Sequence, residues 1–105
     1  MKKDIETEEV IDNRILLIRG EKVILDSDLA KHYGVTIKRL KDNVKKHKDR
    51  FPKDFVFQLN AKEKTKLADL YERLSDLKDS KTRPFAFTEE GAIMAARVLN
   101  NMRAV

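Results

Sequence analysis

The residues best suited to chemistry form one dense run of positive charge between Thr36 and Arg50. Seven lysines and arginines lie in this run and two aspartates oppose them, a balance of 7 − 2 = +5. The whole chain carries the same formal net charge of +5. Lysine and arginine neutralise phosphates and release their counterions, which gives affinity for nucleic acid without reading its sequence. The run therefore predicts an anionic partner, and duplex DNA is the one we expect.

Some side chains in the run have the chemistry to read bases. Arginine binds guanine with two hydrogen bonds and asparagine binds adenine in the same way, which makes Arg39 and Asn43 candidates for base contacts. Asp42 could accept from cytosine, although we favour an ion pair that orients Arg39 or Lys46. The predicted DNA contacts are Thr36, Lys38, Arg39, Lys41, Asn43, Lys45, Lys46 and Arg50.

Two helices joined by a tight turn are predicted to position this charge. A short helix is expected over residues 28–32, with Asp26 or Ser27 as its N-cap. Gly34 supplies the left-handed residue that ends it. Thr36 is expected to cap a second helix over residues 36–48.

The second helix has an apolar stripe and a basic face. Ile37, Leu40 and Val44 are spaced by three and four residues, so they predict one buried stripe. The outward face then holds Lys38, Arg39, Asp42 and Lys46, with Lys41 and Lys45 flanking one side and Asn43 and Thr36 the other. This helix-turn-helix pattern predicts that the second helix docks in the major groove of DNA.

The remaining elements predict a small sheet. Residues 14–25 read as a β-hairpin with Gly20 at the turn, and further strands are expected over 54–59 and 83–87. Pro84 indicates an edge strand or a strand start. Helices are expected over 61–70, continuing toward Leu74, and over 88–99, with a loop at 75–82. The predicted fold is α+β, a helix-turn-helix core with a small, mainly antiparallel sheet in the order ββ-αα-β-α-β-α. The last two strands could act as a wing, as in winged-helix proteins.

Composition sets the domain organisation and the compartment. The 105 residues suit one domain, with 41% apolar and 39% charged residues. Residues 1–13 carry 2 − 5 = −3 and predict an acidic leader, which leaves 14–105 as the single domain. Cysteine is absent, and we find neither a signal peptide nor an apolar run of about 20 residues that could span a membrane. We expect a cytoplasmic protein.

No arrangement of residues predicts an enzyme. His32 and His47 lack cysteine partners at a zinc-binding spacing, and a metal shared by Asp28 and His32 is a weak alternative. No glycine frame surrounds a nucleophile, and the three glycines form no phosphate-binding loop. We therefore expect no catalytic residue, no metal and no cofactor.

Two blocks carry a resemblance to a known family: Arg50-Phe51-Pro52-Lys53-Asp54-Phe55 and Phe87-Thr88-Glu89-Glu90-Gly91. With Val23–Ala30, Tyr33-Gly34-Val35 and Lys38-Arg39-Leu40, they make the chain resemble the "ORF-six N-terminal" domain of phage and bacterial proteins, a relative of the KilA-N and Bro-N domains. The resemblance covers roughly residues 15–105. It implies a DNA-binding domain in a phage- or prophage-type regulator of transcription. The matching basic positions are Lys38, Arg39, Lys45 and Arg50.

The chain departs from the family pattern in two places. Lys46-His47 stand where the family tends to have Arg-Asn, and Ala95-Ala96 stand where a bulkier pair is frequent. Because the pattern is still running at Val105, we expect a longer protein with a second, C-terminal domain.

Two other functions stay open on the residues alone. The basic helix could meet an acidic protein partner, which would make the chain a protein-interaction module. It could also be an accessory domain of a larger nucleic-acid enzyme. RNA is an alternative ligand, and a homodimer is plausible because helix-turn-helix modules often bind as twofold pairs.

Overall fold

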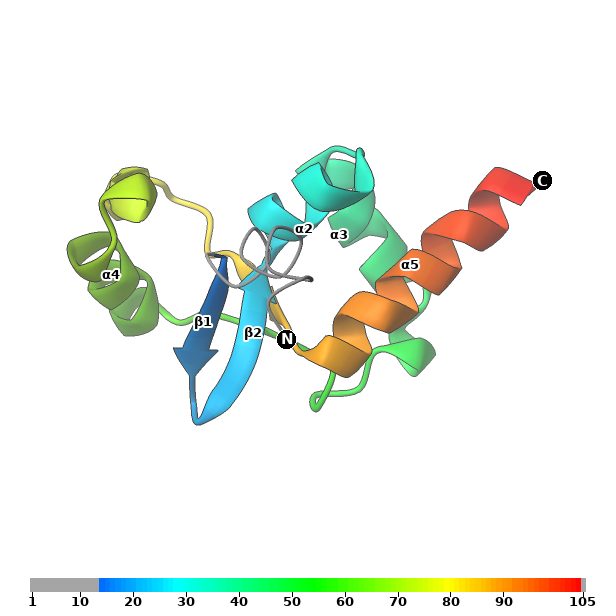
Figure 1. Ribbon diagram of the computed structural model, residues 1–105, viewed down its shortest axis with the longest axis horizontal. Coiled ribbons are helices and arrows are strands. Elements are labelled where there is room, and N and C mark those ends of the chain that lie inside the picture. The colour runs from blue at the N-terminus through cyan, green and yellow to red at the C-terminus, as the bar shows by residue number, and fades with distance from the viewer. Residues whose placement is uncertain (1–13, 105) are drawn as a thin grey trace, which may run out of the picture.

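The computed structural model describes residues 14–104, with side-chain surroundings for residues 14–100; the predicted leader at 1–13 lies outside this range. In chain order the elements are β1 (Ile15–Ile18), β2 (Glu21–Leu25), α2 (Asp26–Tyr33), α3 (Ile37–Lys46), the 3-10 helix η2 (Lys48–Arg50), β3 (Val56–Gln58), α4 (Ala61–Leu70), the 3-10 helix η3 (Glu72–Lys78), β4 (Phe85–Phe87) and α5 (Glu89–Ala104) (Figure 1). The α+β class and the predicted order ββ-αα-β-α-β-α are confirmed.

The strands form one antiparallel sheet in the order β1-β2-β4-β3. Arg19 and Gly20 both have positive φ, 56° and 76°, which matches the type I′ turn that a two-residue hairpin favours. β4 lies between β2 and β3, so Pro84 precedes a central strand and does not mark an edge. β3 and β4 share a sheet with the hairpin, and they do not project as a separate wing.

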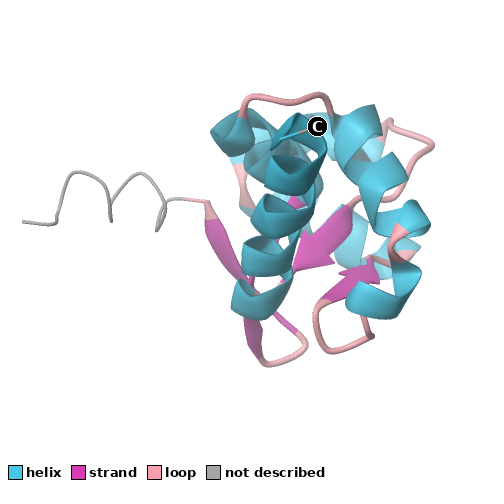
Figure 2. Ribbon diagram, turned by 90° about the vertical axis from the view of Figure 1, so that its right-hand side faces the viewer, coloured by secondary structure: helices cyan, strands magenta, loops and turns pink. Residues whose placement is uncertain are grey.

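Helices cover both faces of this sheet, which gives three layers (Figures 1 and 2). Because strand side chains alternate between faces, neighbouring residues of one strand enter different cores. Phe87 packs with Leu29, Leu40 and Val98 beneath α2, α3 and α5. On the opposite face α4 and η3 pack their apolar residues on the strands, in a core that contains Leu16, Val23, Leu25, Leu59, Leu67, Leu74 and Ala86.

The α4–η3 segment leaves the sheet after β3 and returns to it at β4. The Leu59 amide donates to the Pro84 carbonyl at 2.9 Å, and this hydrogen bond joins the two ends of the α4–η3 segment. The predicted continuation of α4 toward Leu74 is wrong, because α4 ends at Leu70, Tyr71 is extended, and η3 follows. The predicted loop at 75–82 is confirmed only for residues 79–82, since η3 extends to Lys78. A continuous helix would place Leu74 about 10 Å beyond Leu67 along its axis. The break lets both leucines enter the same core.

The start of α5 is docked on the segment before β3. The Thr88 amide donates to the Phe55 carbonyl at 2.9 Å, and its hydroxyl lies 3.1 and 3.2 Å from the carbonyl oxygens of Asp54 and Phe55. The same hydroxyl accepts from the Gly91 amide at 3.3 Å, so Thr88 caps α5 as predicted. A Cβ on Gly91 would lie 2.0 Å from the Phe55 oxygen, so only glycine fits there. The two blocks that carry the family resemblance therefore bind each other.

Candidate nucleic-acid interface

A three-residue turn connects α2 and α3. Gly34 has φ 71° and ψ 32°, and the Val35 amide donates to the Ala30 carbonyl at 2.9 Å, which closes the end of α2. Val35 packs against the core cluster of both helices. Thr36 caps α3, since its hydroxyl accepts from the Arg39 amide at 3.0 Å. The predicted turn and the predicted cap of α3 are confirmed.

Asp26 holds the start of α2 against both α3 and the sheet. Its buried carboxylate accepts from the Phe85 amide at 2.9 Å and lies 3.5 Å from Lys41 Nζ. The predicted N-cap at Asp26 or Ser27 is wrong, because α2 begins at Asp26 and its N-cap is Leu25. The Lys41 side chain is only 19% exposed and its Nζ lies 5.2 Å from the Phe85 ring centre. Lys41 therefore ties α3 to the fold and does not face outward.

The buried side of α3 is rotated from the predicted stripe. Leu40 and Val44 are buried as expected, but Ile37 is 41% exposed and Asn43 only 4% exposed. The Asn43 amide group donates to the Arg39 carbonyl at 2.9 Å, and its Oδ1 has no hydrogen-bond partner within residues 14–100. In this conformation Asn43 offers a base almost no accessible surface.

The exposed side of α3 carries the cations that remain. Lys38 and Asp42 form an i,i+4 ion pair at 3.1 Å, so Asp42 pairs with Lys38 and not with the predicted Arg39 or Lys46. Arg39, Lys45 and Lys46 are exposed and make no ion pair with any residue that the structure describes. A shallow hollow of about 280 Å³ runs along this face, and its lining is Thr36, Lys38, Arg39, Asp42, Asn43 and Lys46.

The positive surface continues beyond the end of α3. Arg50 lies in η2, is exposed and has no ion-pair partner among the described residues. Lys48, also in η2, and Lys53, in the turn before β3, are likewise exposed and have no ion-pair partner among the described residues; the predicted contact set did not include them. The first turn of α3 holds no acidic residue, so its positive helix end is not offset by a carboxylate. An anion approaching this face meets several cations that the fold has not neutralised.

Asp28, one of the two residues considered for a metal site, is engaged by arginines. Asp28 accepts from Arg73 Nη1 at 3.1 Å and lies 3.7 Å from Arg14 Nε, so cations already hold its carboxylate. Within the described residues there is no group of three or more histidine, aspartate or glutamate side chains that could hold a metal ion. No helix within residues 14–104 is both long enough and apolar enough to cross a membrane.

Comparison with known proteins identifies a family. The chain matches the family model of the ORF6N domain over residues 13–98, which is most of its length. No curated protein and no solved structure matches the chain.

Proposed function

We propose that this chain, which belongs to the ORF6N domain family, binds duplex DNA through the exposed face of α3. The observation that carries the proposal is the set of exposed cations on α3 and η2 that have no acidic partner within residues 14–100. A helix with this charge, presented by a fixed turn, suits the major groove.

The roles of the side chains differ by position. Arg39, Lys45, Lys46 and Arg50 contact phosphates in this proposal, because their charge is free and exposed. Lys38 joins them once its ion pair with Asp42 opens, a low barrier for a pair in solvent. Thr36 holds the first turn of α3, and its hydroxyl keeps a proton to donate to a phosphate.

A salt titration tests the proposal. Anisotropy of labelled duplex DNA is measured for wild type and for Arg39→Ala/Lys45→Ala/Lys46→Ala. The matched control is Lys62→Ala/Lys66→Ala/Lys81→Ala, which removes three exposed lysines elsewhere. Wild type should give a slope of log K against log salt near −4, and the α3 variant should lose about 2 to 3 of it, since each phosphate contact contributes about 0.9. The control should lose less than about 1.

Two outcomes would contradict the proposal. Equal losses in both triple variants would mean that net charge, and not α3, attracts DNA. No binding at about 50 mM salt, with the fold intact, would favour the interaction-module alternative, because low salt strengthens every phosphate contact. A duplex RNA competitor that displaces DNA at equal concentration would make RNA the ligand.

The regulatory role is a further part of the proposal, and the ORF6N family membership supports it. A regulator of phage or prophage genes must prefer one site over bulk DNA by about a thousandfold or more. Selection from a random duplex pool should therefore enrich a defined sequence. A pool that stays random after selection would argue against transcription regulation and leave general DNA binding in place.

A further inference from the structure

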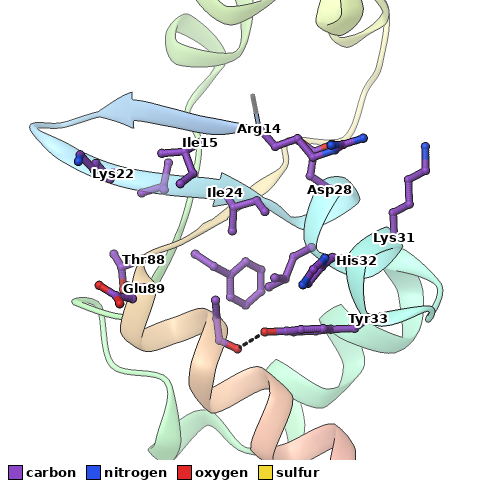
Figure 3. Close-up of a pocket in the computed structure, with 14 residues that line it drawn as sticks. Arg14, Ile15, Lys22, Ile24, Asp28, Lys31, His32, Tyr33, Thr88 and Glu89 are labelled. Atoms are coloured by element: carbon purple, nitrogen blue, oxygen red, sulfur yellow. Dashed lines mark hydrogen bonds and ion pairs between the residues drawn. The ribbon is translucent and has the colours of Figure 1, made fainter. Parts of the chain in front are cut away.

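A second surface lies away from the exposed face of α3. A groove of about 680 Å³ opens between the hairpin, α2 and the start of α5 (Figure 3). Ile15, Ile24 and Ala92 are the partly exposed apolar residues of its lining, whereas Val23, Leu29 and Phe87 are buried. Its volume falls within the range of about 300–1,000 Å³ that is typical of ligand pockets.

The groove exists because none of the helices within residues 14–104 covers the outer half of the hairpin on this side. Ile15 pairs with Ile24 and Leu17 with Lys22, so these residues share a sheet face. Leu16 and Ile18, which point to the other face, are buried beneath α4 and η3. Leu17 is 72% exposed. An apolar strip thus extends from the groove along β1 to the hairpin turn.

The wall of the groove is fixed before anything binds. The Tyr33 hydroxyl donates to the Ala92 carbonyl at 2.9 Å and joins the end of α2 to α5. Burial raises the pKa of Tyr33, so the hydroxyl keeps its proton at neutral pH. Because the groove is already formed, binding a ligand requires little additional ordering of the protein.

Unpaired cations lie at both ends of the groove. Lys22 extends from β2 at one end and Lys31 from α2 at the other (Figure 3). Both are exposed, and neither makes an ion pair within the described part of the chain. Of the two acids in the lining, Asp28 is held by Arg14 and Arg73, whereas Glu89 is exposed in the first turn of α5, where the helix dipole favours its charge.

We propose that this groove binds a segment of a partner protein whose apolar centre is flanked by acidic residues. Leucine- or isoleucine-sized side chains cover Ile15, Ile24 and Ala92, and carboxylates meet Lys22 and Lys31. The apolar floor disfavours nucleic acid, which presents charge and not alkyl groups. None of the exposed cations of α3 lines the groove, so DNA and the partner can bind at once. The proposal stands independently of DNA binding.

The test uses the full chain and a labelled peptide with a leucine–isoleucine centre flanked by glutamates. Lys22→Glu/Lys31→Glu should weaken binding of this peptide about tenfold and should gain binding of a counterpart flanked by lysines. The control Lys62→Glu/Lys66→Glu, on the outer face of α4, should change neither affinity by more than about twofold. In the isotope-labelled chain, the peptide should shift the methyl signals of Ile15 and Ile24.

Each other outcome overturns the proposal. Failure of wild type to bind the peptide at about 1 mM would do so, because that concentration detects even weak interfaces. Equal loss in both double variants would reduce the effect to net charge. Concentration-dependent dimerisation abolished by Leu17→Glu would make a second copy the occupant. Duplex DNA affinity is measured on the same variants, so failure of the groove and failure of the α3 surface are read separately.

Discussion

Helices α3 and α4 resemble each other in length and cap chemistry, but they differ in how many of their charged side chains have partners within the fold. Each spans ten residues and begins at a side-chain cap, Thr36 in one and Asn60 in the other. By sequence, α3 holds five cations and one acid, 5 − 1 = +4, whereas α4 holds three and two, 3 − 2 = +1. The larger difference is in what these charges touch.

In α4 the charged side chains are largely used to hold the fold. Glu63 completes a capping box with Asn60 and also accepts two hydrogen bonds from Arg19, at 2.7 and 3.0 Å. Lys64 is buried and donates to the Ser80 carbonyl, and Asp69 pairs with Lys78 at 2.6 Å. In α3 only Lys41 is used in this way. A basic helix becomes a candidate interface when its cations have no acidic partners in the folded protein. The number of its charged residues does not show whether this is so.

We expect both helices to be equally part of the cooperative fold, and truncation of their core residues tests this. Leu40→Ala and Leu67→Ala each remove a buried side chain, so each should lower the free energy of unfolding by about 2–5 kcal/mol. Leu70→Ala, at an exposed site of α4, should cost less than about 0.5 kcal/mol. Urea denaturation measures all three. A near-zero cost for Leu67→Ala would mean that α4 is only loosely attached.

Charge reversal separates the two helices in function. Lys45→Glu/Lys46→Glu should lower DNA affinity about a hundredfold at low salt, because it replaces two phosphate contacts with repulsions. Lys62→Glu/Lys66→Glu makes the same change of net charge on α4 and should lower affinity less than about threefold. Anisotropy with one duplex at one salt concentration compares them directly. Similar losses would remove the distinction between the helices.

The Arg19–Glu63 pair makes the attachment of α4 to the hairpin depend on pH. The hydrogen bonds from Arg19 lower the pKa of Glu63, so the pair stabilises the fold above the ordinary glutamate pKa and is lost as pH falls through the lowered value. Glu63→Gln should therefore lower the thermal midpoint by a few degrees at pH 7, and the difference from wild type should shrink near pH 3. Glu72→Gln, at an exposed site, is the control. A constant difference at all pH values would contradict the assignment.

The smallest effect is expected at Asp42, the one acid in α3. Asp42→Asn removes a carboxylate that repels phosphates and frees Lys38 from its ion pair. DNA affinity should rise about two- to threefold at low salt and show no change at about 0.5 M, where exposed charges are screened. Asp76→Asn, exposed in η3, should have no effect. A fall in affinity would indicate that Asp42 contacts a base.

The parts of the fold that depend on local chemistry could be predicted from the sequence. The hairpin turn at Arg19-Gly20, the left-handed Gly34 and the caps at Thr36 and Thr88 each depend on residues within a few positions. So does the Leu40–Val44 part of the buried stripe. The general location of free charge on α3 follows from the same stripe.

The parts that depend on distant partners could not be predicted. Lys41 is held by Asp26 and Phe85, and these contacts exist only after the sheet has formed. Ile37 and Asn43 exchange their expected burial because tertiary packing rotates the buried side of α3, and no local pattern records that rotation. The central position of β4 depends on a chain that leaves the sheet for a helix and returns to it. The predicted exposure of Lys41 and Asn43 was wrong because both polar side chains pack inside the protein.

The hydrogen bond between Leu59 and Pro84 fixes the two ends of the α4–η3 segment at the sheet. The length of that segment can therefore change without moving the rest of the fold. Its two ends meet at the sheet whatever the chain does between them, and lengthening a loop costs only about 0.6 kcal/mol per doubling. Insertions within residues 60–83 are therefore tolerable provided that Leu67 and Leu74 still cover their side of the sheet. The α4–η3 segment can therefore change in size while α3 keeps its orientation.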